Sequence, residues 1–388
     1  VGVIFYVVLG LRRRLRETGW FEKRRIAVPN MADYLDLVAL GTVADVVPLD
    51  RNNRVLVHQG LQRIRAGRCR PGISALLRVA GRNPARAQAC DMGFAVGPRL
   101  NAAGRLDDMA LGIRCLLADD AQEASNLASD LDRLNRERRA IEEGMKQQAE
   151  AMLADWAPRQ VDDLPWGLCL YRPDWHQGVI GILASRIKER YHRPVIAFAS
   201  AGHGELKGSA RSIDGLHVRD VLDEVAVRAP GVIRKFGGHA MAAGMTLDAD
   251  RFDTFSQVFD ATVRDHLAPD DLLPLVHSDG SIEPSAMTLE TARQLVDGGP
   301  WGQGFPEPMF DDRFEVVSSR VVGGKHWKLL LRPMAADMTL DGIAFHAVDG
   351  LPTMPAFIHA AYRLDQNEWQ GRLRLQLRIE YLEAAAAP

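Results

Sequence analysis

The chain has 388 residues, of which 47% are hydrophobic and 25% are charged, and its formal net charge is −2. This length predicts two or three domains, and the composition excludes a disordered or low-complexity protein. Because the charge is nearly balanced, any surface that binds nucleic acid must be local and offset by acidic surface elsewhere.

Residues 1–11 are apolar and are followed by three arginines, at 12–14. Eleven residues are too few to cross a bilayer, and the basic cluster follows the apolar run instead of preceding it as in a signal peptide. We therefore predict a buried strand or helix of an α/β core and no membrane segment. The chain opens on Val and not Met, which indicates an N-terminally truncated gene product.

Four cysteines are scattered along the chain with no CxxC pair: Cys69, Cys90, Cys115 and Cys169. Scattered single cysteines are typical of a reducing compartment, where disulfides are rare. They predict buried thiols in a cytoplasmic protein and argue against a disulfide framework or a zinc site.

Residues 1–117 alternate apolar runs with Gly, Pro and Asp, which is typical of an α/β layer. One apolar element at 34–40 continues to Asp45, while Asp36 on the same element is interpreted as structural. Residues 119–156 carry apolar side chains at helical spacing and predict one long helix that connects two domains.

A second α/β unit follows the connector. Its predicted strands are 167–171, 194–199 and 206–212, and its predicted helices are 179–191, 217–226 and 251–266. From about residue 271 the pattern becomes β-rich, with the clearest alternation at 372–379. About five short strands fit a small barrel.

Asp45 ends the run Gly-Thr-Val-Ala-Asp. An acidic residue that follows an apolar run can project a hard oxygen ligand into a cleft at a strand end. An N-cap or turn aspartate is the alternative interpretation.

Residues 97–105 place Arg99, Asn101 and Arg105 among small residues. Small residues let a phosphate approach the backbone, and guanidinium groups can clamp it. An ordinary surface loop has the same composition, so the local pattern leaves both interpretations open.

Three further motifs also predict anion contacts. His176 and Gln177 open a helix, whose N-terminus attracts anions, although simple capping is the alternative. Alternation puts Ser209 and Arg211 on one strand face, either for a phosphate or as a solvated face. His239 lies in a glycine-rich loop where the backbone can reach a ligand, although a lone histidine is usually structural.

Taken together and in this order, the motifs resemble the RecJ family of single-strand-specific 5′→3′ DNA exonucleases, within the DHH phosphoesterase superfamily. The matching runs are GTVADVVPL at 41–49, PRLNAAGR at 98–105, HQGVIGILASR at 176–186, GSARS at 208–212 and GGHAMAAG at 237–244. The phrases LNRERR at 134–139 and PWGQGFPEP at 300–308 also match, so the resemblance covers essentially the whole chain.

The resemblance implies two α/β lobes joined by a long connector helix, plus a C-terminal OB-like β-barrel. It places the C-terminal part of a DHH catalytic domain at 1–117, the connector at 118–158, a DHH-associated domain at 159–268 and a single-strand-binding barrel at 269–388. It also implies a two-metal site with Mn²⁺ or Mg²⁺, single-stranded DNA as substrate and a role in DNA repair and recombination. Expected protein partners are a single-strand-binding protein and a RecQ-type helicase.

The same resemblance assigns roles to individual residues. Asp45 becomes the catalytic metal ligand. The phosphate and DNA contacts are Arg99, Asn101, Arg105, His176, Ser209, Arg211 and His239. The candidates for base stacking are Trp301, Phe305, Trp327 and Trp369, although most aromatic residues of a barrel belong to its core.

One departure from the family pattern concerns the metal. The Asp-x-Asp motif, a further Asp and the Asp-His-His motif are not found at fitting positions, so the chain holds about one carboxylate of an incomplete two-metal site. Two alternatives therefore stay open: a small-nucleotide or oligonucleotide phosphodiesterase of the same superfamily, and a non-catalytic single-strand-binding subunit. The barrel favours long strands over small nucleotides.

Overall fold

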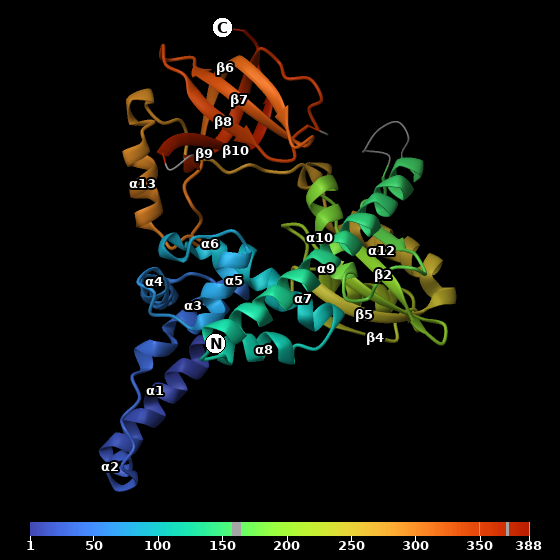
Figure 1. Cartoon of the computed structure of the whole chain (residues 1–388). Helices are drawn as coiled ribbons and strands as arrows, with labels where there is room; N and C mark the ends of the chain where they lie inside the picture. Colours follow the sequence, from blue (N-terminus) through green and yellow to red (C-terminus); the bar gives the residue numbers. More distant parts are fainter. Residues whose placement is uncertain (157–163, 349, 370–371, 388) are drawn as a thin grey trace. The chain divides into compact units, whose positions relative to one another are not determined.

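The computed structural model describes residues 1–156, 164–348, 350–369 and 372–387. The chain, which Figure 1 colours along its sequence, divides into two compact units. The first unit contains Val1–Pro98, Leu116–Ser125 and Val276–Pro388. The second contains Arg99–Cys115 and Asn126–Leu275. Each unit is described by itself below.

The N-terminal part of the first unit is helical. Its elements are α1 (Gly2–Glu17), α2 (Trp20–Arg24), α3 (Leu35–Ala44), α4 (Arg51–Arg65), α5 (Pro71–Val79), α6 (Ala89–Asp91) and a π-helical turn (Met92–Val96). No strand occurs among residues 1–117, all of which the structure describes, so the prediction of an α/β layer is wrong for this segment. The physical reason is that a continuous apolar run has no period that separates strand from helix.

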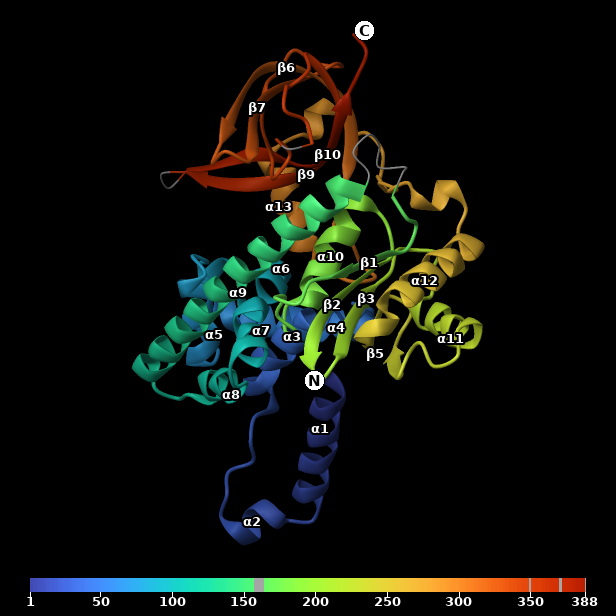
Figure 2. The same ribbon diagram turned by 90° about the vertical axis from the view of Figure 1, so that its right-hand side faces the viewer.

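Helix α1 also differs from the prediction of a buried element. Phe5 is buried, whereas Val3, Ile4 and Val7 are exposed. Both views show α1 and α2 projecting away from the other helices of this unit (Figure 2). The apolar composition of residues 1–11 correctly predicted a regular secondary-structure element. It did not predict that most of this element would be exposed.

The connector is confirmed as one uninterrupted helix, α9 (Ala121–Trp156), of 36 residues. Asp120 caps it, because its carboxylate accepts a hydrogen bond from the Glu123 N–H at 2.8 Å. Ala124, Ala128 and Leu131 are fully buried, which matches the apolar stripe read from the sequence. No described helix is long and apolar enough to cross a membrane.

The second unit is built on a five-stranded sheet of order β1-β2-β3-β5-β4. Its strands are β1 (Leu168–Tyr171), β2 (Val195–Gly202), β3 (Glu205–Arg211), β4 (Lys235–Gly238) and β5 (Ala242–Asp248). Strands β1 and β2 are parallel and the remaining pairs are antiparallel. The predicted strands and helices of this region are therefore confirmed, with small shifts at their ends.

Helices cover the two faces of this sheet unequally. Helices α11 (Val218–Arg228) and α12 (Phe252–His266) pack on one face, against residues such as Phe198 and Leu206. On the other face, α9 and α10 (Ile180–Tyr191) pack against buried side chains of β1 and β2. Because side chains alternate along a strand, β3 turns Leu206 and Ala210 to the first face and Lys207, Ser209 and Arg211 to the second.

The C-terminal part of the first unit contains a closed barrel of order β10-β8-β7-β6-β9. Its strands are β6 (Phe310–Val322), β7 (His326–Pro333), β8 (Leu340–Ala344), β9 (Phe357–Trp369) and β10 (Arg372–Ala384), with α13 (Leu289–Gly298) packed on its core. Strands β8 and β10 are parallel and the other pairs antiparallel. The mixed α/β class, the long connector and the OB-like barrel are thus confirmed.

The four cysteines form no disulfide, and all four lie among the described residues. Cys115 and Cys169 are buried as expected, and Cys69 is partly buried. Cys90 is exposed, so the prediction of buried thiols is wrong for this residue.

Candidate nucleic-acid interface

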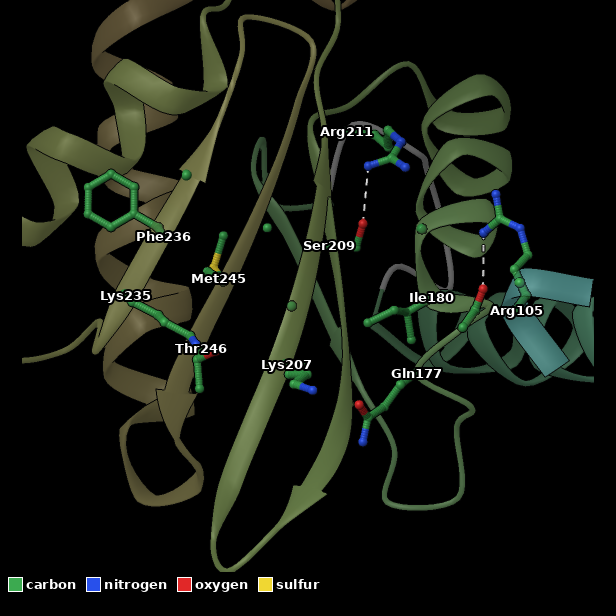
Figure 3. Close-up of a pocket in the computed structure, with 16 residues that line it drawn as sticks. Arg105, Gln177, Ile180, Lys207, Ser209, Arg211, Lys235, Phe236, Met245 and Thr246 are labelled. Carbon is green, nitrogen blue, oxygen red and sulfur yellow. Dashed lines mark hydrogen bonds between the residues drawn. The ribbon is translucent and has the colours of Figure 1, made fainter. Parts of the chain in front are cut away.

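A cleft of about 700 Å³ opens on the second face of the sheet in the second unit (Figure 3). Its floor is formed by β3, β5 and β4. Its wall is formed by Gln177, Gly178 and the start of α10, together with the end of α7 (Gly97–Leu106). The cleft therefore occupies the part of the face that the buried contacts of α9 and α10 leave open.

The charges in this cleft have one sign. Among the described residues, Arg105, Lys207, Arg211 and Lys235 line it, and no Asp or Glu does. Within the part of the chain that the structure describes, none of these four cations forms an ion pair with a carboxylate. A cleft lined by several cations without described carboxylate partners is suited to an anionic ligand with more than one charge.

Hydrogen bonds hold the two arginines in place. The Arg211 Nη1 donates to Ser209 Oγ at 3.1 Å and to the Ala210 carbonyl at 2.7 Å. The Arg105 Nη1 donates to the Gly178 carbonyl at 3.1 Å, which ties α7 to the turn before α10. Figure 3 shows both guanidinium groups at the same side of the cleft, near Ser209.

The electrostatics of the two arginines favour an added anion. Burial lowers the pKa of the Arg105 guanidinium, and the charge of Glu142 acts in the opposite direction. Burial also lowers the pKa of Arg211, and the positive charge of Arg105 lowers it further. A bound anion would compensate both the lost solvation and the mutual repulsion.

Glycines keep the floor and wall of the cleft free of side chains. Ser209, Gly244 and Gly237 lie opposite one another in register across β3, β5 and β4. A Cβ at Gly237 would meet nothing within 4 Å, so the backbone there is open to a ligand. A Cβ at Gly181 would lie 2.9 Å from both Arg211 Nη2 and Ser209 Oγ, so the wall needs glycine at this position.

Arg99 and Asn101 do not line the cleft, although both belong to α7. Arg99 is only 8% exposed, and its guanidinium pairs with Asp132 of α9 at 2.9 Å. This is the arrangement of a structural ion pair. Asn101 is exposed and lies one helical turn before Arg105.

His176 and His239 are both exposed and are also absent from the cleft lining. The His176 Nδ1 accepts a hydrogen bond from the Gly178 N–H at 3.1 Å, so its ring acts locally at the turn before α10. The His239 N–H donates to the Ala242 carbonyl at 2.8 Å and closes the turn between β4 and β5. Of the predicted contacts, the structure thus brings together Arg105, Ser209 and Arg211.

Sequence reasoning missed Lys207 and Lys235, which also line the cleft. The signal for Lys207 was present, because it stands two residues before Ser209 on the same alternating strand. Lys235 precedes the glycines of β4, and only the pairing of β4 with β5 places it on the cleft floor.

Asp45 follows α3 as its C-terminal cap, so the apolar element before it is a helix, and Asp45 does not lie at a strand end. It is exposed, belongs to the first unit, and its carboxylate forms no hydrogen bond or ion pair in the described part of the chain. Asp36 is structural as expected: it is buried and accepts hydrogen bonds from the backbone of Leu37 and Arg70 at 2.7 Å each.

A two-metal site does not fit the residues present. Among the described residues, no group of three or more His, Cys, Asp or Glu could hold a metal ion. A Mg²⁺ or Mn²⁺ ion prefers an octahedral set of oxygen ligands, and the single Asp45 carboxylate supplies few of them. No catalytic step through a metal is therefore derived from this chain.

Three of the four predicted base-stacking residues are engaged in internal contacts of the first unit. Trp301 stacks on Phe305 with ring centroids 4.8 Å apart, and the Arg54 guanidinium lies 3.9 Å from the Phe305 centroid. Trp327 is 7% exposed and belongs to the barrel core, where its Nε1 donates to the Leu351 carbonyl at 2.9 Å. The side chain of Trp369 lies outside the described residues.

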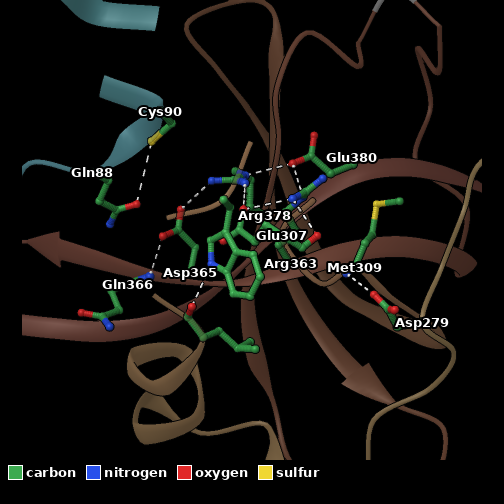
Figure 4. Close-up of polar contacts among 12 residues, drawn as sticks. Gln88, Cys90, Asp279, Glu307, Met309, Arg363, Asp365, Gln366, Arg378 and Glu380 are labelled. Atoms are coloured by element: carbon green, nitrogen blue, oxygen red, sulfur yellow. Dashed lines mark hydrogen bonds and ion pairs between the residues drawn. The ribbon is translucent and has the colours of Figure 1, made fainter. Parts of the chain in front are cut away.

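Ion pairs continue from this aromatic stack into the barrel (Figure 4). Glu307, two residues after Phe305, accepts hydrogen bonds from Arg363 of β9 at 3.1 Å and from Arg378 of β10 at 2.9 Å. Arg378 also donates to Glu380 at 3.0 Å. The loop that carries Trp301 and Phe305 is therefore anchored to α4 through Arg54 and to the barrel through Glu307.

We expect Phe305→Ala to lower the free energy of unfolding by about 2 kcal/mol, since it removes a ring packed between Trp301 and Arg54. Phe94→Ala is a matched control, because Phe94 is 81% exposed and its loss should change stability by less than about 0.5 kcal/mol. Chemical denaturation of the two variants measures the difference. Equal stability of both would show that the stack contributes nothing to the fold.

Residues 166–265 match the DHHA1 domain family, and residues 278–381 match the RecJ OB domain family. The chain is 56% identical over 386 residues to the single-stranded-DNA-specific exonuclease RecJ of Dickeya dadantii and 55% identical over 383 residues to that of Escherichia coli. Each alignment covers 98% of this chain and 66% of the relative, so the chain spans 66% of the length of these relatives.

Solved structures give the same result. The crystal structure of RecJ in complex with Mg²⁺ from Thermus thermophilus superposes with a TM-score of 0.74 at 31% identity, over 95% of this chain and 54% of that one. A crystal structure of the same protein in complex with Mn²⁺ superposes with the same TM-score, over 52% of its length. The similarity thus extends through both units of this chain.

Proposed function

This chain belongs to the RecJ family of single-stranded-DNA-specific exonucleases, and we propose that it supplies the strand-binding part of such an enzyme. The proposed reaction of the whole protein is 5′→3′ hydrolysis of phosphodiester bonds in single-stranded DNA with Mn²⁺ or Mg²⁺. Action in DNA repair and recombination, beside a single-strand-binding protein and a RecQ-type helicase, belongs to the same proposal. A cytoplasmic location stays a prediction.

The observation that supports this proposal most is the cleft of the second unit. Arg105, Ser209 and Arg211 lie together there, and no described carboxylate lines the cleft, which suits the terminal 5′-phosphate of a strand. Guanidinium groups bind phosphate through charge-assisted hydrogen bonds, and Ser209 Oγ adds a hydroxyl group. Lys207 and Lys235 extend the positive charge along the floor, where further phosphates of the strand would lie.

In this proposal the residues of the chain bind and orient the strand. The two arginines hold the terminal phosphate, and the open glycine backbone at Gly237 and Gly244 admits the first nucleotide without a steric barrier. Asp45 is the proposed metal ligand by motif match, and the ions would supply the activated water and charge stabilisation in the complete enzyme.

We expect Gly181→Ala to weaken binding of single strands that carry a 5′-phosphate by about tenfold, because the new methyl group would displace Arg211 and Ser209. Gly144→Ala in α9 is the control, since a Cβ there meets nothing within 4 Å. Binding of phosphorylated oligonucleotides to both variants checks the expectation. An unaffected Gly181→Ala variant would show that the cleft tolerates the methyl group and that Arg211 is not held as described.

A non-catalytic single-strand-binding subunit is the second candidate function. It is favoured by the observation that the motif match assigns a single metal ligand, Asp45. A nuclease assay on the full-length protein separates the two functions. Digestion of single-stranded DNA would exclude the rival. A small-nucleotide phosphodiesterase is less favoured, because the closed barrel at β6–β10 fits the binding of longer strands.

A further inference from the structure

We propose that the barrel binds an unpaired nucleobase on the exposed ring of Phe345, at the end of the barrel that carries the β6–β7 turn. This inference rests on the proposed binding of single-stranded DNA. It assigns a stacking residue that neither the sequence motifs nor the cleft identified.

The barrel topology places Phe345 beside that turn. Gly323 and Gly324 form the turn in left-handed conformations, with φ values of 58° and 70°, and β7 starts at His326. Strand β8 runs antiparallel to β7 and pairs its last residue, Ala344, with Trp327. Phe345 follows directly, so it emerges where β7 begins. In OB-fold barrels the loop between the first two strands and the face of the second and third strands bind oligonucleotides.

The Phe345 ring is both accessible and held in position. It is 55% exposed, and it makes an edge contact with the His326 ring at a centroid distance of 5.2 Å and an interplanar angle of 75°. His326 is fixed in turn, because its Nδ1 accepts a hydrogen bond from the His346 N–H at 2.9 Å. His346 has the left-handed φ of 54°, an uncommon conformation for a residue other than glycine. A preorganised aromatic ring is suited to stacking, since little freedom is lost on binding.

Positive charge accompanies this ring. The Lys325 carbonyl accepts a hydrogen bond from the Val348 N–H at 3.4 Å, which places Lys325 next to the loop that carries Phe345. Lys325 is exposed and forms no ion pair with a described carboxylate. Lys328 is neutralised by Asp341 at 3.4 Å. An exposed aromatic ring beside a cation that has no partner among the described residues is a combination with which proteins bind single strands, because the ring stacks on a base and the cation contacts the backbone.

The alternative stacking residues are less suited to this role. Trp301 and Phe305 stack on each other, and Trp327 is buried in the barrel core. Tyr381 of β10 is 43% exposed, but its hydroxyl donates to Glu383 at 3.0 Å, and a carboxylate repels a DNA backbone. Tyr381 therefore provides a matched control on the same barrel.

The test measures binding of the 388-residue chain to a single-stranded oligonucleotide of about 16 nucleotides, the upper site size of one OB fold. We expect Phe345→Ala to weaken binding about 5- to 150-fold, the loss typical of one base–aromatic stack. Phe345→Trp should bind at least as tightly as the unchanged chain. Phe345→Leu, which keeps the apolar volume and favours folding, should bind as weakly as Phe345→Ala. Tyr381→Ala should have no effect.

A second oligonucleotide separates stacking from charge. With abasic sites throughout, the sugar–phosphate backbone remains and the bases are gone, so Phe345→Ala and the unchanged chain should bind it equally. Lys325→Ala should instead weaken both oligonucleotides and reduce the salt dependence by about one phosphate contact. If Phe345→Ala or Phe345→Leu weakened binding of both oligonucleotides equally, the inference would be overturned.

Failure of the stacking inference can be distinguished from failure of the proposed strand binding. If the unchanged chain binds and Phe345→Leu binds the intact oligonucleotide equally well, the stacking inference is wrong and the proposed function stands. If the unchanged chain, shown to be folded by its thermal unfolding, binds neither oligonucleotide, both the inference and the proposed strand binding fail.

Discussion

Arg211→Ala in the full-length protein should weaken binding of strands that carry a 5′-phosphate by about 1–3 kcal/mol, the usual contribution of a charge-assisted hydrogen bond. Strands without the phosphate should be affected much less. The reason is geometric: the Arg211 guanidinium lies against Ser209 Oγ in the cleft and has no carboxylate partner among the described residues. Competition binding with phosphorylated and unphosphorylated strands measures the difference.

Arg219→Ala is the matched control for this experiment. Arg219 belongs to α11, which packs on the opposite face of the same sheet, and it pairs with Asp223 at 3.6 Å. Its loss should leave both strands unaffected. An equal loss on phosphorylated and unphosphorylated strands for Arg211→Ala would refute a role in reading the terminal phosphate.

Arg105→Ala should weaken binding of strands that carry a 5′-phosphate by a similar amount. The double variant should lose less binding free energy than the sum of the losses of the two single variants. Burial lowers the pKa of Arg211 most, and the like charge of Arg105 lowers it further, so removing one arginine relieves the repulsion on the other. The effects of substitutions at residues that share one ligand are coupled in this way, whereas the effects of substitutions at distant residues are additive. Strict additivity in the double variant would place the two arginines on different phosphates.

The 388-residue chain by itself should bind single-stranded DNA in a salt-dependent way and should not degrade it with Mn²⁺ or Mg²⁺. Binding is expected because the cleft and the barrel both present cations that have no carboxylate partner among the described residues. Degradation is not expected because two-metal hydrolysis needs several ligands to hold both ions, and Asp45 is the single ligand assigned here. Incubation of labelled strands with the chain and each metal, followed by electrophoresis, checks this expectation.

Binding serves as the folding control in that experiment, because an exposed apolar helix α1 favours aggregation. A chain that binds DNA but does not cut it supports the missing-ligand argument. Metal-dependent 5′→3′ degradation by the chain, abolished by Asp45→Ala, would show that other residues supply the remaining ligands. In the full-length enzyme, Asp45→Ala is expected to abolish degradation while binding persists.

The sequence by itself determined the elements whose signals are local. The helical spacing of Ala124, Ala128 and Leu131 was enough to predict α9, because the helical period can be recognised from residues three and four positions apart. The same holds for the alternation that puts Ser209 and Arg211 on one face of β3. Motif order predicted the family, and Asp36 was recognised as structural.

Tertiary structure alone decided what depends on contacts between distant residues. The register that brings Gly244 of β5 opposite Ser209 of β3, and Gly237 of β4 opposite Gly244, creates the cleft floor. No local pattern encodes that pairing. In the same way, the packing of Phe305 against Arg54 joins positions about 250 residues apart and turns a predicted base-stacking residue into an internal contact.

The N-terminal segment and the barrel show the same limit. The apolar run at 1–11 predicted a regular element, but burial depends on which surface packs against it, and α1 leaves Val3 and Ile4 exposed. Phe345 carries no motif, and only the pairing of β8 with β7 places it beside Lys325 and the β6–β7 turn. Side-chain period is a property of adjacent residues, whereas a binding surface is assembled from strands and loops that the chain brings together only when it folds.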